Sequence, residues 1–240
     1  AYVTSNKTKK AALITGHSKN DYTSDYQTLI KKNNYEITVI SDSMIGNISD
    51  EYDAVIIAAP TADFLGAELD ALSKFLENDG KLGKGLIFFA DASAPYLTNF
   101  YDFLEQWGIA VGEGILFETN SQNYMPDDPM TMGTYPTSSD NDITSGMNLC
   151  ITGYNVPITA AYDSEGLITV TSLMSTPESV VAAPVGTTAG WTGADDYTKQ
   201  SYSSVIQSEM SDYDDDNNKI SSYVLAFSSI EFIQSEYNEQ

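Results

Sequence analysis

Short apolar runs with little polar alternation mark the first half of the chain. Residues 53–60 and 84–91 are two such runs, and residues 67–78 between them carry apolar side chains at helical spacing. Strands without polar alternation are buried on both faces, which is typical of parallel strands in α/β proteins. The pattern therefore predicts a right-handed strand–helix–strand unit over residues 53–93.

The remaining first half extends this unit in both directions. Residues 11–15 and 35–41 are predicted strands, and apolar side chains at spacings of three and four predict a helix over residues 22–33. A short helix over 99–106 and extended chain within 109–118 follow. Alternating strands and helices of this kind predict a doubly wound, mostly parallel open sheet for the first 118 residues.

The pattern changes after residue 118. Residues 120–142 are rich in loop-forming residues, and short strands are predicted at 149–152, 158–162, 168–173, 180–183, 203–210 and 222–228, with a helix beginning within 230–237. No linker is long enough to separate two domains. After a polar segment at 1–10, we expect a single α/β domain over 11–240, in which the loop- and strand-rich residues 119–240 complete the sheet of residues 11–118.

Composition restricts the partners of this domain. The chain has 240 residues, of which 42% are hydrophobic, and its 34 acidic against 11 basic residues give a net charge of -23. This charge argues against nucleic acid and an anionic membrane surface as direct partners. Cys150 is the only cysteine, so an intrachain disulfide is impossible. No apolar run approaches the ~20 residues of a membrane span, and a membrane anchor would lie outside this sequence.

Several short motifs occur in an order that is typical of one family. In the first half they are Leu13-Ile-Thr-Gly-His17, Tyr35-Glu-Ile-Thr-Val39, residues 52–61, residues 68–80 with their leucines and Phe75, and Trp107-Gly108-Ile109. In the second half they are residues 142–144, 170–176 and 228–232. In this order the chain resembles the gliding-motility type auxiliary domain of bacterial ABC transport systems. Asp79-Gly80 departs from a Gly-Gly pair that is common there, and the acidic stretch 212–216 is not part of the pattern.

The resemblance carries expectations about fold and role. It implies a relative of the class I glutamine amidotransferase-like and flavodoxin-like folds, and of an intraflagellar-transport domain. It further implies an extracytoplasmic module that is held by membrane segments outside this chain and works beside an ABC transporter permease or another envelope protein. The family has no established catalytic residues, so none is carried over, and no cofactor is expected.

A ligand cleft is one candidate for function. In a doubly wound sheet, ligands bind beyond the carboxyl ends of the strands. Short polar side chains at these ends could equally cap the loops, and Gly16 could serve only a strand-to-helix turn. The candidate ligand-binding residues are Gly16, His17, Ser18, Pro60, Thr61, Asp91 and Ser93.

An enzyme is a more remote alternative. His17 is the only histidine, so a nucleophile activated by histidine would be Ser93 or Cys150 with His17 as its base. The turn after residues 84–91 contains neither cysteine nor the Gly-x-Ser-x-Gly pattern of a nucleophile elbow. We therefore expect no catalytic residues.

One acidic stretch has the spacing of a calcium loop. Asp212, Asp214 and Asp216 occupy alternate positions, as metal-binding carboxylates do in an EF-hand. Asn217 replaces the required glycine, however, and Tyr223 stands at the position of the bidentate glutamate. A hairpin turn with solvated carboxylates is the preferred interpretation.

The sequence therefore predicts a non-enzymatic extracytoplasmic accessory domain of an ABC transport system, which acts through protein or ligand contacts. A small-molecule or glycan-binding module at the carboxyl edge of the sheet is the first alternative, and an amidotransferase or hydrolase is the second.

Overall fold

The computed structural model describes residues 8–18, 24, 35–41, 46, 48–138 and 143–233. Its helical elements with defined ends are α2 (Gly66–Glu77), α3 (Thr98–Gln106), η1 (Asn78–Gly80), η2 (Ala194–Asp196) and η3 (Ile230–Ile233). The first strands are β1 (Lys9–Ile14), β2 (Tyr35–Ile40), β3 (Ala54–Ala58), β4 (Gly85–Phe89), β5 (Ile109–Val111) and β6 (Ile115–Glu118). The later strands are β7 (Tyr124–Met125), β8 (Asp128–Pro136), β9 (Cys150–Gly153), β10 (Ile158–Ala160), β11 (Ser164–Glu165), β12 (Ile168–Ser175), β13 (Val180–Ala183), β14 (Ser203–Tyr213) and β15 (Lys219–Phe227). The predicted helix over 22–33 lies outside the described residues except for Ser24.

Five strands pair in parallel, in the order β2-β1-β3-β4-β15. Helix α2 connects β3 to β4, and these strands pair in register from Ala54 opposite Gly85 to Ala58 opposite Phe89. The strand–helix–strand unit predicted for residues 53–93 is therefore present. The other neighbour of β4 is β15, the last strand of the chain.

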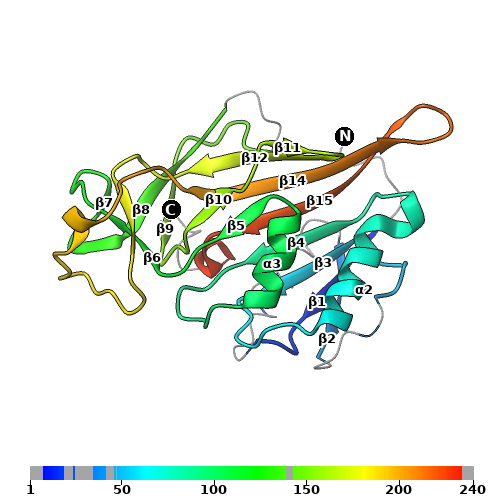
Figure 1. The fold of residues 1–240 in the computed structure, drawn as a ribbon, viewed down its shortest axis with the longest axis horizontal. Helices are drawn as coiled ribbons and strands as arrows, with labels where there is room; N and C mark the ends of the chain where they lie inside the picture. Colours follow the sequence, from blue (N-terminus) through cyan, green and yellow to red (C-terminus); the bar gives the residue numbers. More distant parts are fainter. Residues whose placement is uncertain are drawn as a thin grey trace.

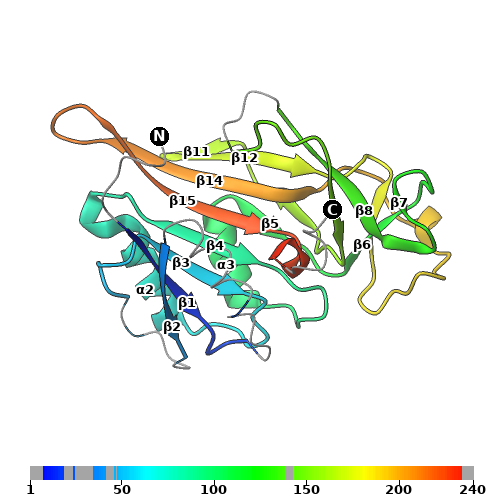
Figure 2. The same ribbon diagram turned by 180° about the vertical axis from the view of Figure 1, so that it is seen from behind.

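The sheet continues beyond β15 with antiparallel strands. β14 and β15 form a long hairpin from Val205 opposite Phe227 to Tyr213 opposite Lys219, and β12 and β8 follow on the far side of β14. The end of this hairpin projects beyond the rest of the molecule (Figures 1 and 2). Two small sheets, β10-β5 and β13-β6, complete the second half.

The prediction of a doubly wound, mostly parallel open sheet of flavodoxin-like or amidotransferase-like type is wrong. The sheet is mixed and strand-rich, because β15 joins the parallel strands to an antiparallel region. Helices α2 and α3 both lie on one face of the parallel part (Figure 1). Hydrophobic period identifies a segment as a strand, but it does not specify the direction of the neighbouring strand. That direction is set here by tertiary pairing.

The main hydrophobic core lies between the sheet and the helices α2 and α3. Phe64, Phe88 and Phe100 are fully buried there, and the Phe100 ring lies 4.7 Å from the Phe64 ring and 5.1 Å from the Phe88 ring. A smaller apolar layer on the opposite face includes Leu13 and is covered by Ile230 of η3. Figure 2 shows this second face.

Gly108 follows α3 in the left-handed backbone region, with φ of 76°. A glycine with a left-handed backbone is typical of the position just after the end of a helix. A Cβ atom here would lie 2.4 Å from Val170 Cγ2 and 2.9 Å from the ring of Tyr162. The Tyr162 hydroxyl also donates a 2.9 Å hydrogen bond to the Gln106 carbonyl. The close approach of α3 to the second half of the chain therefore requires glycine at position 108.

We predict that Gly108→Ala lowers the free energy of unfolding by about 3 kcal/mol, because it combines a left-handed alanine with overpacking. Gly80→Ala is the matched control, since Gly80 has a similar φ of 79° and no heavy atom lies within 4 Å of the point that its Cβ would occupy. This control should lose only about 1 kcal/mol, from the backbone alone. Urea denaturation measures both values, and equal losses would contradict the packing argument.

Candidate functional site

The predicted residues near β1 and β3 tie two loops together. The His17 carbonyl accepts hydrogen bonds from the N–H of Thr61 at 2.7 Å and of the following residue at 3.1 Å. Ser18 Oγ donates to the last carbonyl of β3 at 2.5 Å. Gly16 lies in the turn after β1, and Pro60 is buried in the loop after β3. These contacts are those of a structural turn.

The His17 side chain is buried and has partners at both nitrogens. Nδ1 lies 3.1 Å from the Ala62 carbonyl and Nε2 lies 3.0 Å from Glu68 Oε1. Because a carbonyl oxygen can only accept, Nδ1 carries a hydrogen, and a further proton lies between Nε2 and the carboxyl group. Glu68 Oε2 also accepts the Leu65 N–H at 2.8 Å, at the start of α2. His17 therefore anchors the turn after β1 to the first turn of α2.

Two residues that sequence reasoning did not select complete this anchor. The His17 ring stacks on Phe64 with centroids 4.0 Å apart. Asp63 accepts the N–H groups of Asn99 at 2.9 Å and Phe100 at 3.1 Å, which satisfies donors at the start of α3. Asp63 precedes α3 by more than thirty residues, so no local motif could identify this contact. The sequence pointed to Glu68 only as the first residue of the family-like motif at 68–80.

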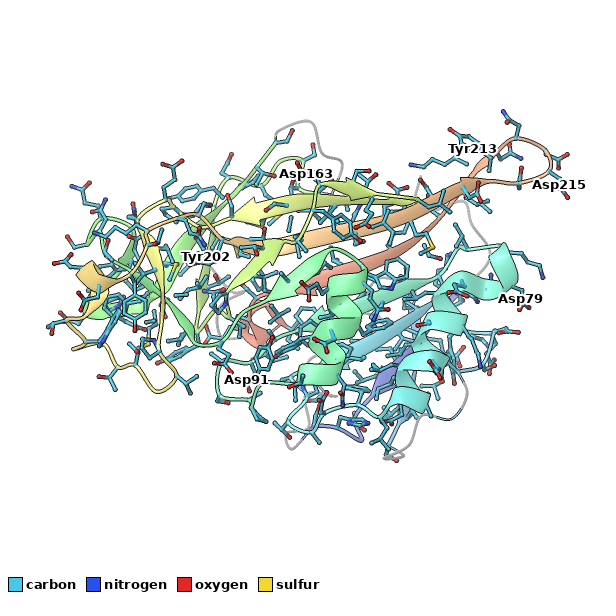
Figure 3. The ribbon with its side chains drawn as sticks, viewed as in Figure 1. Asp79, Asp91, Asp163, Tyr202, Tyr213 and Asp215 are labelled. Atoms are coloured by element: carbon cyan, nitrogen blue, oxygen red, sulfur yellow. The ribbon has the colours of Figure 1, made fainter. Side chains whose placement is uncertain are left out.

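Asp91 and Ser93 lie apart from this anchor, beside a cleft at the end of β4. Asp91 Oδ1 accepts hydrogen bonds from the N–H and Oγ of Ser93, both at 2.8 Å. Asp91 lies in the loop between β4 and α3 (Figure 3). The cleft has a volume of about 490 Å³ and is lined by Asp91, Ala92, Ser93, Ile115, Tyr154, Val185, Gly186, Thr187, Ser229, Ile230 and Glu231. The structure thus divides the seven predicted residues into an anchor and a cleft.

Glu231 is the cleft residue with the most perturbed surroundings. Burial raises the pKa of its carboxyl group, and the negative charges of Asp128 and Asp91 raise it further. The Gly153 N–H opposes this by donating to Glu231 Oε2 at 2.9 Å. Sequence reasoning placed this residue in a helix and gave it no chemical role. The cleft therefore presents a hydrogen-bonding carboxyl group that takes up a proton more readily than usual.

The candidate nucleophiles have other partners than histidine. Ser93 Oγ donates to Asp91, and both nitrogens of His17 are engaged by Ala62 and Glu68. Burial raises the pKa of the Cys150 thiol, so the reactive thiolate is disfavoured. Neither arrangement supports a histidine-activated nucleophile.

The acidic stretch forms the turn of the β14–β15 hairpin. Asp214 Oδ1 accepts the N–H groups of Asp216 at 3.0 Å and Asn218 at 2.8 Å, and Asp212 Oδ1 accepts the Tyr213 N–H at 2.8 Å. These hydrogen bonds, first of all those from Asn218, lower the pKa of Asp214. Tyr213 and Asp215 mark the projecting end in Figure 3. The geometry is that of the hairpin turn that the sequence favoured over a calcium loop.

A second cavity of about 610 Å³ opens on the sheet face opposite α2 and α3. Its carboxylates are already paired, since Asp53 accepts from Lys9 at 3.3 Å and Glu209 contacts Lys219 at 2.7 Å. Burial alone would raise the pKa of Glu209, but hydrogen bonds from Lys219 and Ser221 lower it overall. The smaller cleft at Asp91 is therefore the better candidate for a ligand.

Two features are absent from the residues that the structure describes. No three His, Cys, Asp or Glu side chains in this part of the chain are grouped so that they could hold a metal ion. Among the same residues, no helix has both the length and the apolar character needed to cross a membrane.

Comparison with known proteins gives two similarities. The model of a family described as "ABC-type uncharacterized transport system" matches residues 8–226. Among solved structures, the mmIFT52 N-terminal domain is similar with a TM-score of 0.64 and 12% sequence identity, over 97% of this chain and 91% of that chain. At this identity the second similarity shows the fold alone. No curated protein matches the sequence.

We predict that His17→Ala lowers the free energy of unfolding by about 3 kcal/mol, because it removes a buried ring that stacks on Phe64 and contacts Glu68 Oε1. Glu68→Gln and the double variant complete a mutant cycle, in which we expect a coupling of at least about 1 kcal/mol. Lys10→Ala is the control, since Lys10 forms an exposed pair with Glu51 at 2.7 Å and should change the unfolding midpoint little. If His17→Ala changed the free energy of unfolding as little as this control, His17 would not anchor the turn after β1 to α2.

We predict opposite pH dependences for two carboxyl groups. A raised folded-state pKa at Glu231 stabilises the fold at low pH, and this contribution is lost as the pH rises above the ordinary value of 4.5. Glu231→Gln, which stays neutral, should therefore gain stability relative to the wild type between about pH 4 and pH 7. Glu209→Gln should lose stability relative to the wild type as the pH rises through about 4.5, because the lowered pKa of Glu209 stabilises the fold above this ordinary value and that contribution is lost below it. Thermal unfolding across this range measures both, and trends of the same sign would contradict the assignment.

Proposed function

The chain belongs to the family described as ABC-type uncharacterized transport system, and we propose that it is a non-enzymatic, extracytoplasmic accessory domain of such a system. It acts by binding another protein of the system, such as the transporter permease or another envelope protein. The observation that carries this proposal is the family match over residues 8–226, nearly the whole chain.

The site geometry supports a non-enzymatic role. His17, the only histidine of the sequence, is committed to the contact between the turn after β1 and α2. Ser93 and Cys150 have surroundings that do not activate them. The residues that could supply nucleophilic chemistry thus serve the fold.

The charge of the chain supports a protein partner. A net charge of -23 repels nucleic acid and anionic lipid headgroups. In keeping with the family resemblance, we propose that contact with the membrane is made by segments outside this chain, which would hold the domain on the outer side of the membrane.

A second candidate function is binding of a small molecule or glycan in the cleft at the end of β4. The specific observation is the cavity of about 490 Å³, in which the carboxyl groups of Asp91 and Glu231 lie with serine, threonine and tyrosine side chains. Pockets of this size and mixed lining suit small ligands.

We predict that a panel of sugars and amines contains a ligand that raises the thermal unfolding temperature of the wild type. This increase should be lost in Asp91→Asn and Glu231→Gln but kept in His17→Gln.

We predict that the tagged chain, expressed in its native cells, recovers subunits of one ABC transporter from detergent-solubilised membranes. An unrelated folded domain of similar size and net charge is the control bait. Mass spectrometry identifies the recovered proteins. Recovery of the same proteins by both baits, or of no transporter subunit by the chain, would overturn the proposal.

A further inference from the structure

Strand β9 is an edge strand with an open hydrogen-bonding position. β9 pairs with β8 in antiparallel register, with Gly133 opposite Ile151, and has no other strand neighbour among the described residues. The Gly133 N–H points away from β9 and donates to the Asn123 carbonyl. In an antiparallel pair, a residue opposite one that points outward also points outward. The N–H and C=O of Ile151 therefore face the free side of β9.

The next outward-facing N–H on this edge, that of Gly153, already donates a hydrogen bond. This contact shows that the free side of β9 accepts a hydrogen-bonding partner. The Gly153 N–H, two residues along, donates to Glu231 Oε2 at 2.9 Å. The carboxylate takes the place that a carbonyl oxygen of another strand would take. Within the described part of the chain no such group lies on Ile151, whose carbonyl has only a 3.9 Å contact with the Cys150 thiol.

Apolar side chains surround this open position. Leu149 and Tyr135 cover Gly133, since Leu149 Cδ1 and the Tyr135 hydroxyl lie 2.8 and 3.3 Å from the position that a Cβ of Gly133 would take. Ile151 lies opposite Gly133 on the same face. Leu149, Ile151 and Tyr135 are 50%, 41% and 44% exposed. We call these three side chains and the outer edge of β9 the β9 patch.

Two uncharged stretches of the sequence carry the β9 patch, and Asp140 and Asp142 lie between them in the sequence. Residues 129–138 and 143–162 contain no Asp, Glu, Lys or Arg, although 19% of the sequence is charged. Edge strands are usually protected from further pairing by lysine, proline or a bulge. β9 has none of these protections in its sequence, Cys-Ile-Thr-Gly.

We propose that the β9 patch binds an extended apolar segment of a partner protein, which adds to β9 as a further strand and carries basic residues at its ends. The open N–H and C=O of Ile151 would pair with the backbone of that segment, and Leu149 and Tyr135 would contact its alternate side chains. This inference names the surface through which the proposed accessory function operates, and it rests on that function for the identity of the partner.

Charge selects this occupant over a second copy of the chain. Two copies would each bring a net charge of -23, which opposes their approach. Basic residues flanking an apolar segment would instead be attracted to a chain of this net charge. The partner is therefore an apolar strand with basic flanks.

The test uses the full chain and two synthetic peptides, acetyl-KVTITVK-amide and acetyl-EVTITVE-amide. We expect the basic peptide to change the NMR chemical shift of the Ile151 amide and to slow its hydrogen exchange. The acidic peptide should bind at least about tenfold more weakly. Leu149→Lys and Ile151→Pro should weaken binding of the basic peptide by about tenfold or more. Proline at 151 removes an N–H that β8 does not use, so the ladder with β8 is retained.

Leu167→Lys is the matched control, since Leu167 is 54% exposed outside the patch. It should bind the basic peptide as the wild type does. Absence of peptide binding by the wild type, or equal loss in Leu149→Lys and Leu167→Lys, would overturn the inference. A dimer in sedimentation equilibrium that Ile151→Pro dissociates would also overturn it, in favour of a second copy.

The same variants separate the inference from the proposed function. Capture of transporter subunits that is lost in Leu149→Lys and kept in Leu167→Lys supports both. Capture that all variants retain leaves the proposed function standing and rejects the β9 patch as the contact. Peptide binding at the β9 patch without any transporter capture rejects the proposed function alone.

Discussion

Parallel pairing of β15 with β4 is the contact on which the rest of the sheet depends. It joins the last strand of the chain to residues 85–89 and places the antiparallel ribbon β14–β15 beside the parallel strands. Ser222 fixes this junction, because its Oγ donates to the Leu76 carbonyl at 2.7 Å and accepts the Lys84 N–H at 3.1 Å. The second half of the chain is thereby held against the end of α2, and residues 229–231, which follow β15, are brought to the cleft at the end of β4.

Local elements could be predicted from the sequence where burial follows a simple period. The apolar runs at 53–60 and 84–91 became β3 and β4, and the helix between them ends where Asn78 adopts a left-handed backbone with φ of 48°. The direction of pairing could not be predicted in this way. β14 mixes apolar residues with serines and charged residues, and its side chains change from buried at Ser203 to exposed at Tyr213, so its sequence gives no sign that it lies in the centre of a mixed sheet.

The candidate site was predictable only in part, for the same reason. Asp91 and Ser93 were selected because they follow a strand, and they do line a cleft. His17 was selected on the same ground, but its ring lies over Phe64 and against Glu68, inside the fold. Glu231 reaches the cleft from the other end of the chain, and only the pairing of β15 with β4 brings it there. The pairing of strands that are far apart in the sequence therefore decides which polar residues at strand ends line the cleft and which stabilise the fold.

The contact between Glu231 and Gly153 links the cleft at the end of β4 with the edge of β9. A cationic ligand that drew the Glu231 carboxylate into the cleft would release the Gly153 N–H. The open edge of β9 would then include Gly153 as well as Ile151. By thermodynamic linkage, a strand bound at that longer edge would raise the affinity of the cleft for the ligand by the same factor. One half-buried carboxyl group would in this way couple the binding of a small molecule to the affinity of the domain for a partner protein.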